Sequence, residues 1–317
     1  MVTRKLGRSN LEVTPLCLGT NVFGRIIDER TAFAVLDAYV GAGGNFIDTA
    51  DIYSSGESEA VIGRWMKQRG SRNKVIIATK VGKPMAPDKK GLSRTYIFKA
   101  IEESLKRLQT DVIDLYQSHD DDPETPLEET MQAFDDLVKQ GKIRYIGASN
   151  FTAERLAEAQ RVSQQYGYAR YESLQPLYNL VEREEFENGL QQLSIEQGIG
   201  VIPYFSLARG FLSGKYRPNQ KLPESPRAQG VQKLYMNERG FAILEAVDRV
   251  AAKYNVKPTQ VSLAWLMAQP GITAPISSGT SPEQVGELMQ TIELKLTDED
   301  LEALTNGGMG EGEPRSD

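Results

Sequence analysis

The sequence predicts an α/β fold, a (β/α)8 TIM barrel with an N-terminal β-hairpin and a long loop after the seventh barrel strand. Eight short apolar stretches alternate with amphipathic helical patterns along the 317 residues, and no linker or change in composition divides them. Strands that alternate with helices form parallel sheets, and eight such units in one domain close into a barrel. We therefore expect a single domain over residues 1–317, ending in a disordered tail at 306–317.

The hairpin is expected over residues 2–13, where Gly7-Arg8-Ser9-Asn10 separates two short strand patterns. The barrel strands follow as apolar runs that lead into loops. We expect them at 16–19, 45–48, 75–80, 112–116, 143–147, 171–175, 200–203 and 272–276.

Helices are indicated by apolar residues spaced three and four positions apart. We expect Ser93 to cap one helix, whose apolar stripe ends at Leu108. Thr125-Pro126-Leu127-Glu128 predicts a capping box, with Pro126 at the first position of a helix that stops at Gly141. The other helices are expected at 29–40, 57–68, from 152 onward, 182–197, 237–254, 258–268, 282–289 and 297–305.

Composition narrows the class of protein. The formal net charge is −6, so a general affinity for nucleic acid or an anionic membrane is not expected. No apolar run is long enough to span a membrane, and the first residues lack the apolar region of a signal peptide. The single cysteine, Cys17, is expected in the core, and one cysteine with one histidine predicts no metal site. These features indicate a cytoplasmic protein.

Reactive side chains follow three successive barrel strands. The strand at 45–48 ends in Asp48, with Tyr53 five residues later. The next strand ends in Lys80, and the one after it leads to His119, the only histidine. Because the carboxyl ends of barrel strands converge on one face, we expect these four side chains to meet there.

The four residue types suit proton donation to a carbonyl oxygen. A tyrosine has an ordinary pKa of about 10, too high for ready donation at neutral pH. We expect the ammonium of Lys80 to lower the pKa of Tyr53, the carboxylate of Asp48 to hold that ammonium, and His119 to orient the carbonyl. Taken alone, each of these four residues could instead have a structural role, as a salt-bridge partner or a packed side chain. The chain has no redox group except one thiol, so the hydride must come from a cofactor.

Five segments carry a resemblance to a known family: Phe46-Ile47-Asp48-Thr49-Ala50 with Tyr53, Ala78-Thr79-Lys80, Asp114 to His119, Ile146 to Asn150, and Gly210 to Tyr216. In this order and spacing they make the chain similar to the aldo-keto reductases over essentially its whole length. The resemblance implies reduction of an aldehyde or ketone with a nicotinamide cofactor and no Rossmann domain. It also implies that Tyr53 is the general acid, tuned by Lys80 and Asp48.

The resemblance further implies which residues hold the cofactor. Ser149, Asn150 and Gln175 would bind the carboxamide, and Tyr204 would stack on the nicotinamide ring. Ser206, Leu207, Gly210 and Lys215 would lie along the pyrophosphate. The remaining cofactor candidates are Gly19, Thr20, Asn21, Arg209, Ile276, Ser278, Thr280 and Gln284.

Residues 209–239 give independent support for an anion site. This connection follows the seventh strand, a region where TIM barrels often bind phosphate. Its seven basic and two acidic residues give a net charge of +5 in an otherwise acidic protein. We expect a mobile strap over the dinucleotide; the alternative is a solvated loop whose charge binds nothing.

The expected cofactor is NADP(H), with NAD(H) as a second. Most relatives read the 2′-phosphate with an Arg or Lys just after the last strand, where this chain has Thr280 and Ser281. Leu288 stands where an asparagine often helps to hold the adenine, and no Lys or Arg occurs between Lys257 and Lys295. A charged hydrogen bond contributes about 1.5–3 kcal/mol against about 1 kcal/mol for a neutral one. We therefore expect NADPH to bind better than NADH, but by a smaller factor than in relatives that have the basic residue.

Two other functions stay open. Some aldo-keto reductase relatives, such as potassium-channel beta subunits, bind cofactor and serve mainly as partners, so a regulatory subunit with little turnover is the main alternative. A metal-dependent barrel hydrolase is opposed by the single histidine. The expected substrate is a small carbonyl compound, in a pocket shaped by Phe23, Tyr53, Asn150 and Tyr178.

Overall fold

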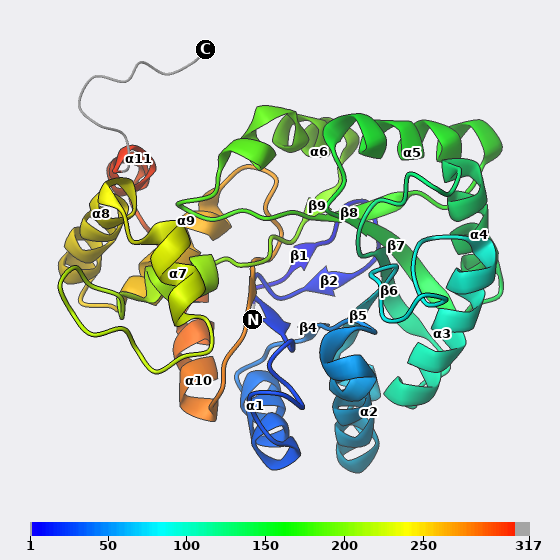
Figure 1. Cartoon of the computed structure of the whole chain (residues 1–317), viewed down its shortest axis with the longest axis horizontal. Coiled ribbons are helices and arrows are strands. Elements are labelled where there is room, and N and C mark those ends of the chain that lie inside the picture. The colour runs from blue at the N-terminus through cyan, green and yellow to red at the C-terminus, as the bar shows by residue number, and fades with distance from the viewer. Residues whose placement is uncertain (1, 308–317) are drawn as a thin grey trace.

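The computed structural model describes residues 2–307, which form a (β/α)8 TIM barrel (Figure 1). Eight parallel strands make the wall in the order β10–β3–β4–β5–β6–β7–β8–β9. The barrel closes through a bridge between Val201 of β9 and Ile272, which precedes β10, and through a hydrogen bond of 2.9 Å from Ile276 N of β10 to Pro203 O, which follows β9. The predicted fold class is confirmed. The strands are β3 (Cys17–Gly19), β4 (Phe46–Asp48), β5 (Ile76–Val81), β6 (Ile113–Ser118), β7 (Ile143–Ser149), β8 (Tyr171–Gln175), β9 (Gly200–Val201) and β10 (Ile276–Ser277).

Helices surround this wall (Figure 1), and in residues 2–307 none is long and apolar enough to cross a membrane. Ser93 caps α3 as predicted, with its hydroxyl oxygen 3.4 Å from Tyr96 N. Asn306 is still helical, and the rest of the expected tail, from residue 308, lies outside the described residues. The helices are α1 (Glu29–Gly41), α2 (Glu57–Arg69), α3 (Arg94–Leu108), α4 (Leu127–Lys139), α5 (Ala153–Tyr166), α6 (Gln191–Gln197), α7 (Ala228–Tyr235), α8 (Glu238–Tyr254), α9 (Pro258–Ala268), α10 (Pro282–Gln290) and α11 (Asp298–Asn306).

The predicted hairpin closes the N-terminal end of the barrel. Its strands are β1 (Arg4–Lys5) and β2 (Glu12–Val13), which pair antiparallel. Leu6 and Leu11 pack in one buried cluster with Cys17 and Phe46, the first residues of β3 and β4. Cys17 is thus a core residue, and the opposite end of the barrel is the one left for chemistry.

The predicted capping box of α4 is wrong. Pro126 occupies the position before the helix in a non-helical conformation (φ −55°, ψ 134°), and α4 begins one residue later, at Leu127. The Thr125 hydroxyl donates to Asp122 Oδ2 at 2.7 Å, so it satisfies a loop carboxylate and caps no helix.

The helix predicted at 182–197 is interrupted. A π-helical turn covers Phe186–Leu190, and inside it Asn188 leaves helical geometry (φ −83°, ψ 69°) while Gly189 has a φ of 106°. Glycine accepts a positive φ without steric cost, so the chain can bulge here before α6 resumes. Apolar periodicity alone does not reveal such a break.

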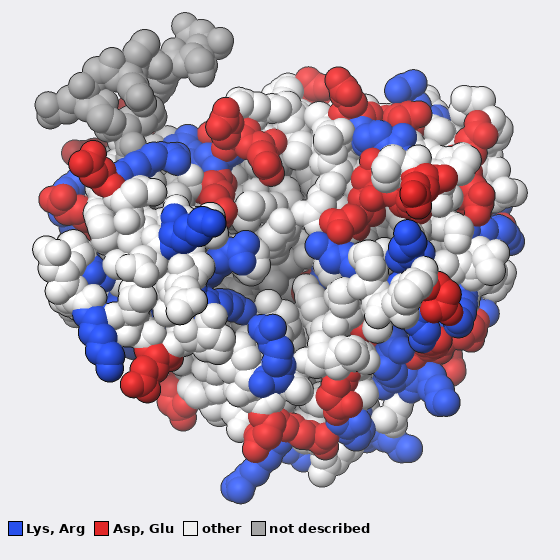
Figure 2. Space-filling view, viewed as in Figure 1, with Lys and Arg blue, Asp and Glu red and all other residues white. Residues whose placement is uncertain are grey.

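The long connection after β9 is present, and it contains structure that the sequence did not predict. A 3-10 segment covers Ala208–Ser213, with positive φ values of 57° at Arg209 and 99° at Gly210. It is followed by α7, which buries Val231 and Tyr235. Figure 2 shows that the face viewed is hollowed near its centre and that Lys and Arg gather around this hollow.

Gly63 in α2 permits a close approach to α3. A Cβ at this position would lie 2.3 Å from Arg107 O and 2.7 Å from Leu108 C. Overpacking of this kind costs about 1–3 kcal/mol, so Gly63→Ala is expected to lower Tm by about 2 °C or more in thermal unfolding. Gly286→Ala in α10 is the matched control, because no atom lies within 4 Å of its Cβ and alanine favours helix. An unchanged Tm for Gly63→Ala would mean that the two helices separate without cost.

Candidate active site

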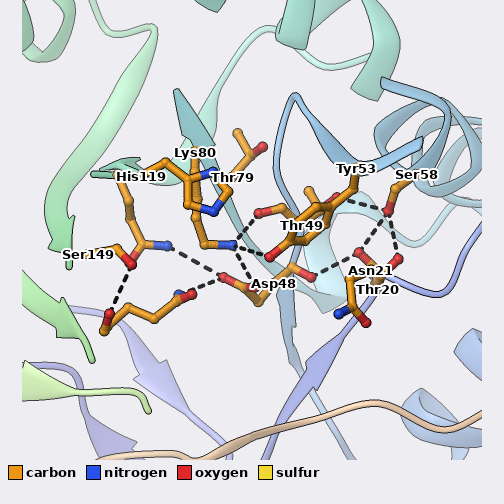
Figure 3. A network of polar contacts seen from close by, with 12 residues as sticks. Thr20, Asn21, Asp48, Thr49, Tyr53, Ser58, Thr79, Lys80, His119 and Ser149 are labelled. Carbon is orange, nitrogen blue, oxygen red and sulfur yellow. Dashed lines mark hydrogen bonds and ion pairs between the residues drawn. The ribbon is translucent and has the colours of Figure 1, made fainter. Parts of the chain in front are cut away.

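The ends of β4, β5 and β6 bring the four candidate catalytic side chains together (Figure 3). Asp48 ends β4, Tyr53 follows in a short 3-10 turn, Lys80 lies in β5 and His119 comes directly after β6. Lys80 Nζ lies 2.7 Å from Asp48 Oδ2 and 3.3 Å from the Tyr53 hydroxyl. The rings of Tyr53 and His119 meet edge to face with centroids 5.9 Å apart. The groups expected to meet at one face of the barrel do so.

Lys80 and Asp48 form a buried ion pair beneath the phenol, with side-chain exposures of 0% and 2%. Lys80 Nζ also donates to Thr49 O at 2.7 Å, and Gln175 Nε2 donates to Asp48 Oδ1 at 2.9 Å. Burial alone would lower the pKa of Lys80, but Asp48 and then Tyr53 raise that pKa above its ordinary value. The ammonium therefore stays charged next to the phenol.

The pKa of Tyr53 shifts in the opposite direction to our expectation. Burial raises this pKa, the Lys80 ammonium lowers it, and the Asp48 carboxylate raises it again, with a net rise above the ordinary value. The ring borders the cavity and is partly exposed, but a phenolate here would still lose most of its hydration. Lys80 thus limits the rise in the pKa of Tyr53 but does not bring that pKa below its ordinary value.

His119 is held as a neutral imidazole. Burial lowers its pKa well below the ordinary value, and the ammonium groups of Lys80 and Lys83 lower it further. Its Nδ1 atom is buried without a hydrogen-bond partner in the part of the chain described. A neutral imidazole carries one N–H donor, which can hold a carbonyl oxygen without competing with Tyr53 for the proton transfer.

A chain of hydroxyls fixes the loop between Asp48 and Tyr53 (Figure 3). Thr20 Oγ1 donates to Asp48 O at 2.9 Å, and Ser58 Oγ lies 2.8 Å from Thr20 Oγ1. Thr49 Oγ1 lies 3.0 Å from the same Ser58 hydroxyl. Thr20, a cofactor candidate, therefore has its hydroxyl engaged in supporting the loop.

A cavity of about 900 Å³ opens above these groups, a size suited to a cofactor with its substrate. Asp48, Tyr53 and His119 line it, whereas Lys80 lies beneath its wall. Every cofactor candidate from the sequence also lines it: Gly19, Thr20, Asn21, Ser149, Asn150, Gln175, Tyr204, Ser206, Leu207, Arg209, Gly210, Lys215, Ile276, Ser278, Thr280 and Gln284.

Asn150 links the catalytic groups to Tyr204. Its Nδ2 donates to His119 O at 2.9 Å and to Asp120 Oδ1 at 2.8 Å, while its Oδ1 accepts from the Tyr204 hydroxyl at 2.9 Å. The Ser149 hydroxyl donates to a backbone carbonyl at 2.9 Å. Asn150 Oδ1 and Ser149 Oγ keep acceptor capacity, which fits the amide N–H groups of a carboxamide.

Three basic side chains that line the cavity have no acidic partner among residues 2–307: Arg209, Lys215 and Arg227. Burial, and then repulsion from Arg227, lowers the pKa of Lys215, and Arg209 Nε is buried without a partner. An anion bound here would relieve this repulsion. Arg217, another basic residue of the same connection, pairs with Asp248 instead. The charge expected to face an anion is therefore carried by three of the seven basic residues.

Some lining residues differ from the prediction. Phe23 and Tyr178, expected to shape the substrate pocket, are core residues with 0% exposure. Lys83 and Lys257 line the cavity although they were not predicted to do so. Lys83 follows β5 closely, so the strand-end argument could have found it, whereas nothing in the sequence brings Lys257 near the end of β10. Within residues 2–307 no three His, Cys, Asp or Glu side chains gather to hold a metal ion.

A buried carboxyl group lies behind the catalytic loop. Both oxygens of Asp51 lack a hydrogen-bond partner within the described range. Burial and the neighbouring Glu59 raise its pKa from 3.8 to about 7, against the opposing effects of Arg107 and Lys80. The folded state therefore binds the Asp51 proton more tightly than the unfolded state does. The contribution of this protonated carboxyl to the free energy of unfolding is full below the unfolded pKa and is lost as pH rises through about 7.

Asp51→Asn is therefore expected to stabilise the protein more at about pH 8 than at about pH 4. A shift of about three pKa units corresponds to about 4 kcal/mol, and Tm measured across this range gives the difference from wild type. Glu245→Gln, which changes an exposed carboxylate, should show no such trend. A difference independent of pH would show that folding does not raise the pKa of Asp51.

The fold and the cavity together define a class of protein. A TIM barrel that places a phenol, an ammonium and an imidazole beneath a cavity with unpaired cations is suited to hydride transfer from a nicotinamide. The model of the aldo/keto reductase family matches residues 15–306. The chain belongs to the aldo/keto reductase family and is an NAD(P)-dependent oxidoreductase, which confirms the resemblance.

Relatives cover nearly the whole chain. An uncharacterized oxidoreductase, YrpG, of Bacillus subtilis is 37% identical over 97% of this chain and 96% of its own length. The aldo-keto reductase yakc [NADP(+)] of Schizosaccharomyces pombe is 34% identical over 93% of this chain and 88% of its own. A probable voltage-gated potassium channel subunit beta of Oryza sativa subsp. japonica is 32% identical, with 93% and 92% covered.

Proposed function

We propose that this protein reduces an aldehyde or ketone to the alcohol, with Tyr53 as proton donor, NADP(H) as the preferred cofactor and NAD(H) as an accepted one. One observation carries the proposal: the Tyr53 hydroxyl lies 3.3 Å from Lys80 Nζ at the wall of a cavity that also holds three unpaired cations. When bound, the reduced nicotinamide supplies the hydride to the carbonyl carbon. The relative named for NADP(+) supports the choice of cofactor.

Each catalytic side chain then has one task. The His119 N–H orients the carbonyl oxygen beside Tyr53. Tyr53 gives its proton to that oxygen, and a raised pKa keeps the phenol protonated at neutral pH. Lys80, held by Asp48, stabilises the phenolate that remains.

Arg209, Lys215 and Arg227 fit the pyrophosphate, since an anion removes the mutual repulsion of these side chains. Ser149 and Asn150 fit the carboxamide at the other end, next to the reacting atoms. With the dinucleotide held this way, its nicotinamide would lie near Tyr53 and His119, the two residues that would bind the carbonyl oxygen.

The test is a panel of aldehydes and ketones assayed with NADPH and with NADH, following the loss of reduced-nicotinamide absorbance. We expect turnover with at least one carbonyl class and with both cofactors, faster with NADPH. Tight cofactor binding without turnover of any carbonyl would contradict the proposed reaction.

A second candidate is a cofactor-binding regulatory subunit with little turnover, favoured by the similarity to a relative named as a potassium channel subunit. The same panel separates the two functions. Binding of NADPH with no reduction would favour the regulatory role, whereas steady turnover would favour the reductase.

A further inference from the structure

We infer that Lys257 and Glu287 set the choice between NADPH and NADH, with Lys257 binding the 2′-phosphate and Glu287 favouring the free ribose hydroxyls. This inference rests on the proposed function. Lys257 immediately precedes α9, Glu287 lies in α10, and Lys257 Nζ pairs with Glu287 Oε1. Both line the cavity, together with Thr280 and Gln284.

Lys257 and Glu287 are held in place through their backbones, while their charged side chains stay exposed. Lys257 N donates to Gln260 Oε1 at 3.1 Å, and Gln260 Nε2 lies 3.4 Å from Glu287 O, so the two helices are tied together. The side chains of Lys257 and Glu287 remain 61% and 41% exposed. The ammonium is therefore open to a ligand phosphate, which would compete with Glu287 for it.

The course of the dinucleotide follows from the groups that line the cavity. The nicotinamide must lie at Tyr53 for hydride transfer, and Arg209, Lys215 and Arg227 suit the pyrophosphate. The adenosine would then extend beyond these cations, on the side of the barrel where α9 and α10 lie together (Figure 1). Lys257 and Glu287 belong to that side.

Among the described residues, Lys257 is the one basic residue of the cavity lining that forms an ion pair with a residue of α10. It supplies from α9 the positive charge that is absent after β10, where the sequence has no Lys or Arg between Lys257 and Lys295. A 2′-phosphate would replace Glu287 as the partner of Lys257. With NADH the pair stays intact, and the Glu287 carboxylate accepts from the ribose hydroxyls while repelling any phosphate.

The two residues should therefore act in opposite directions. Lys257→Met is expected to weaken NADPH binding by about tenfold to a hundredfold, the scale of one charged hydrogen bond, and to change NADH binding by less than about threefold. Glu287→Gln is expected to strengthen NADPH binding and weaken NADH binding, each by about threefold to tenfold.

The readout is the dissociation constant of each reduced cofactor, measured by quenching of intrinsic fluorescence at fixed ionic strength. Lys295→Met is the matched control, because this exposed lysine loses the same charge outside the cavity lining and should change neither constant. Glu287→Gln is an independent test if Lys257→Met does not fold.

Equal effects of Lys257→Met on both cofactors, or no effect on either, would overturn the inference, because Lys257 would then not distinguish the 2′-phosphate from the free ribose hydroxyl. Failure of the wild-type protein to bind NADPH and NADH at all would instead overturn the proposed function. The two failures are thus distinguishable in one set of titrations.

Discussion

Tyr53→Phe is expected to lower carbonyl reduction by at least ~10², the usual scale for loss of a general acid. The variant keeps the ring that meets His119 edge to face and removes only the hydroxyl beside Lys80. No other phenol lies within hydrogen-bond distance of Lys80 Nζ among the described residues, so no second donor can replace it. The measurement is kcat/KM with the best substrate of the carbonyl panel, and the dissociation constant of NADPH should change little.

Tyr116→Phe is the matched control for this variant. Tyr116 is fully buried in β6, lies outside the cavity lining, and its hydroxyl has no hydrogen-bond partner in the region described. Removing this hydroxyl should leave kcat/KM unchanged. Near-normal turnover of Tyr53→Phe would instead place the proton donor elsewhere, and a loss of NADPH binding in that variant would mean that the phenol holds the cofactor.

Most of the fold could be predicted because each strand and helix carries its own pattern. Apolar runs located the strands, and the hydroxyl of Ser93 marked the start of α3. The failures come from contacts between segments. Thr125 carries a capping signal, but its hydroxyl is taken by Asp122, a tertiary arrangement that residue spacing does not encode. The break at Asn188 and Gly189 likewise interrupts a pattern whose apolar spacing continues.

The candidate site could be predicted as far as the barrel rule reaches. Asp48, Lys80 and His119 stand at strand ends, and parallel strands in register force strand ends together. What depends on burial could not be predicted, because burial is a property of the whole fold. The net rise in the pKa of Tyr53 and the core position of Phe23 both depend on burial in this way.

Lys80→Met is expected to lower activity strongly and to shift the remaining pH profile upward. The ammonium opposes the burial that raises the pKa of Tyr53, so removing it raises that pKa further and makes the phenol a weaker acid. Reduction needs the protonated phenol, so the alkaline limb of the kcat/KM profile should move to higher pH. A normal rate with an unchanged profile would mean that Lys80 serves only as the structural partner of Asp48.

The same substitution should destabilise the protein, because it leaves the carboxylate of Asp48 buried with only amide donors from Gln175 and Gln117. Breaking a buried ion pair by removing one partner costs about 3–5 kcal/mol. The double variant Lys80→Met/Asp48→Asn removes both charges and should recover much of that stability in thermal unfolding. It should not recover the rate, because the phenol still lacks the ammonium. Recovery of stability and rate together would show that the loss in Lys80→Met came from the unpaired carboxylate and not from the acidity of Tyr53.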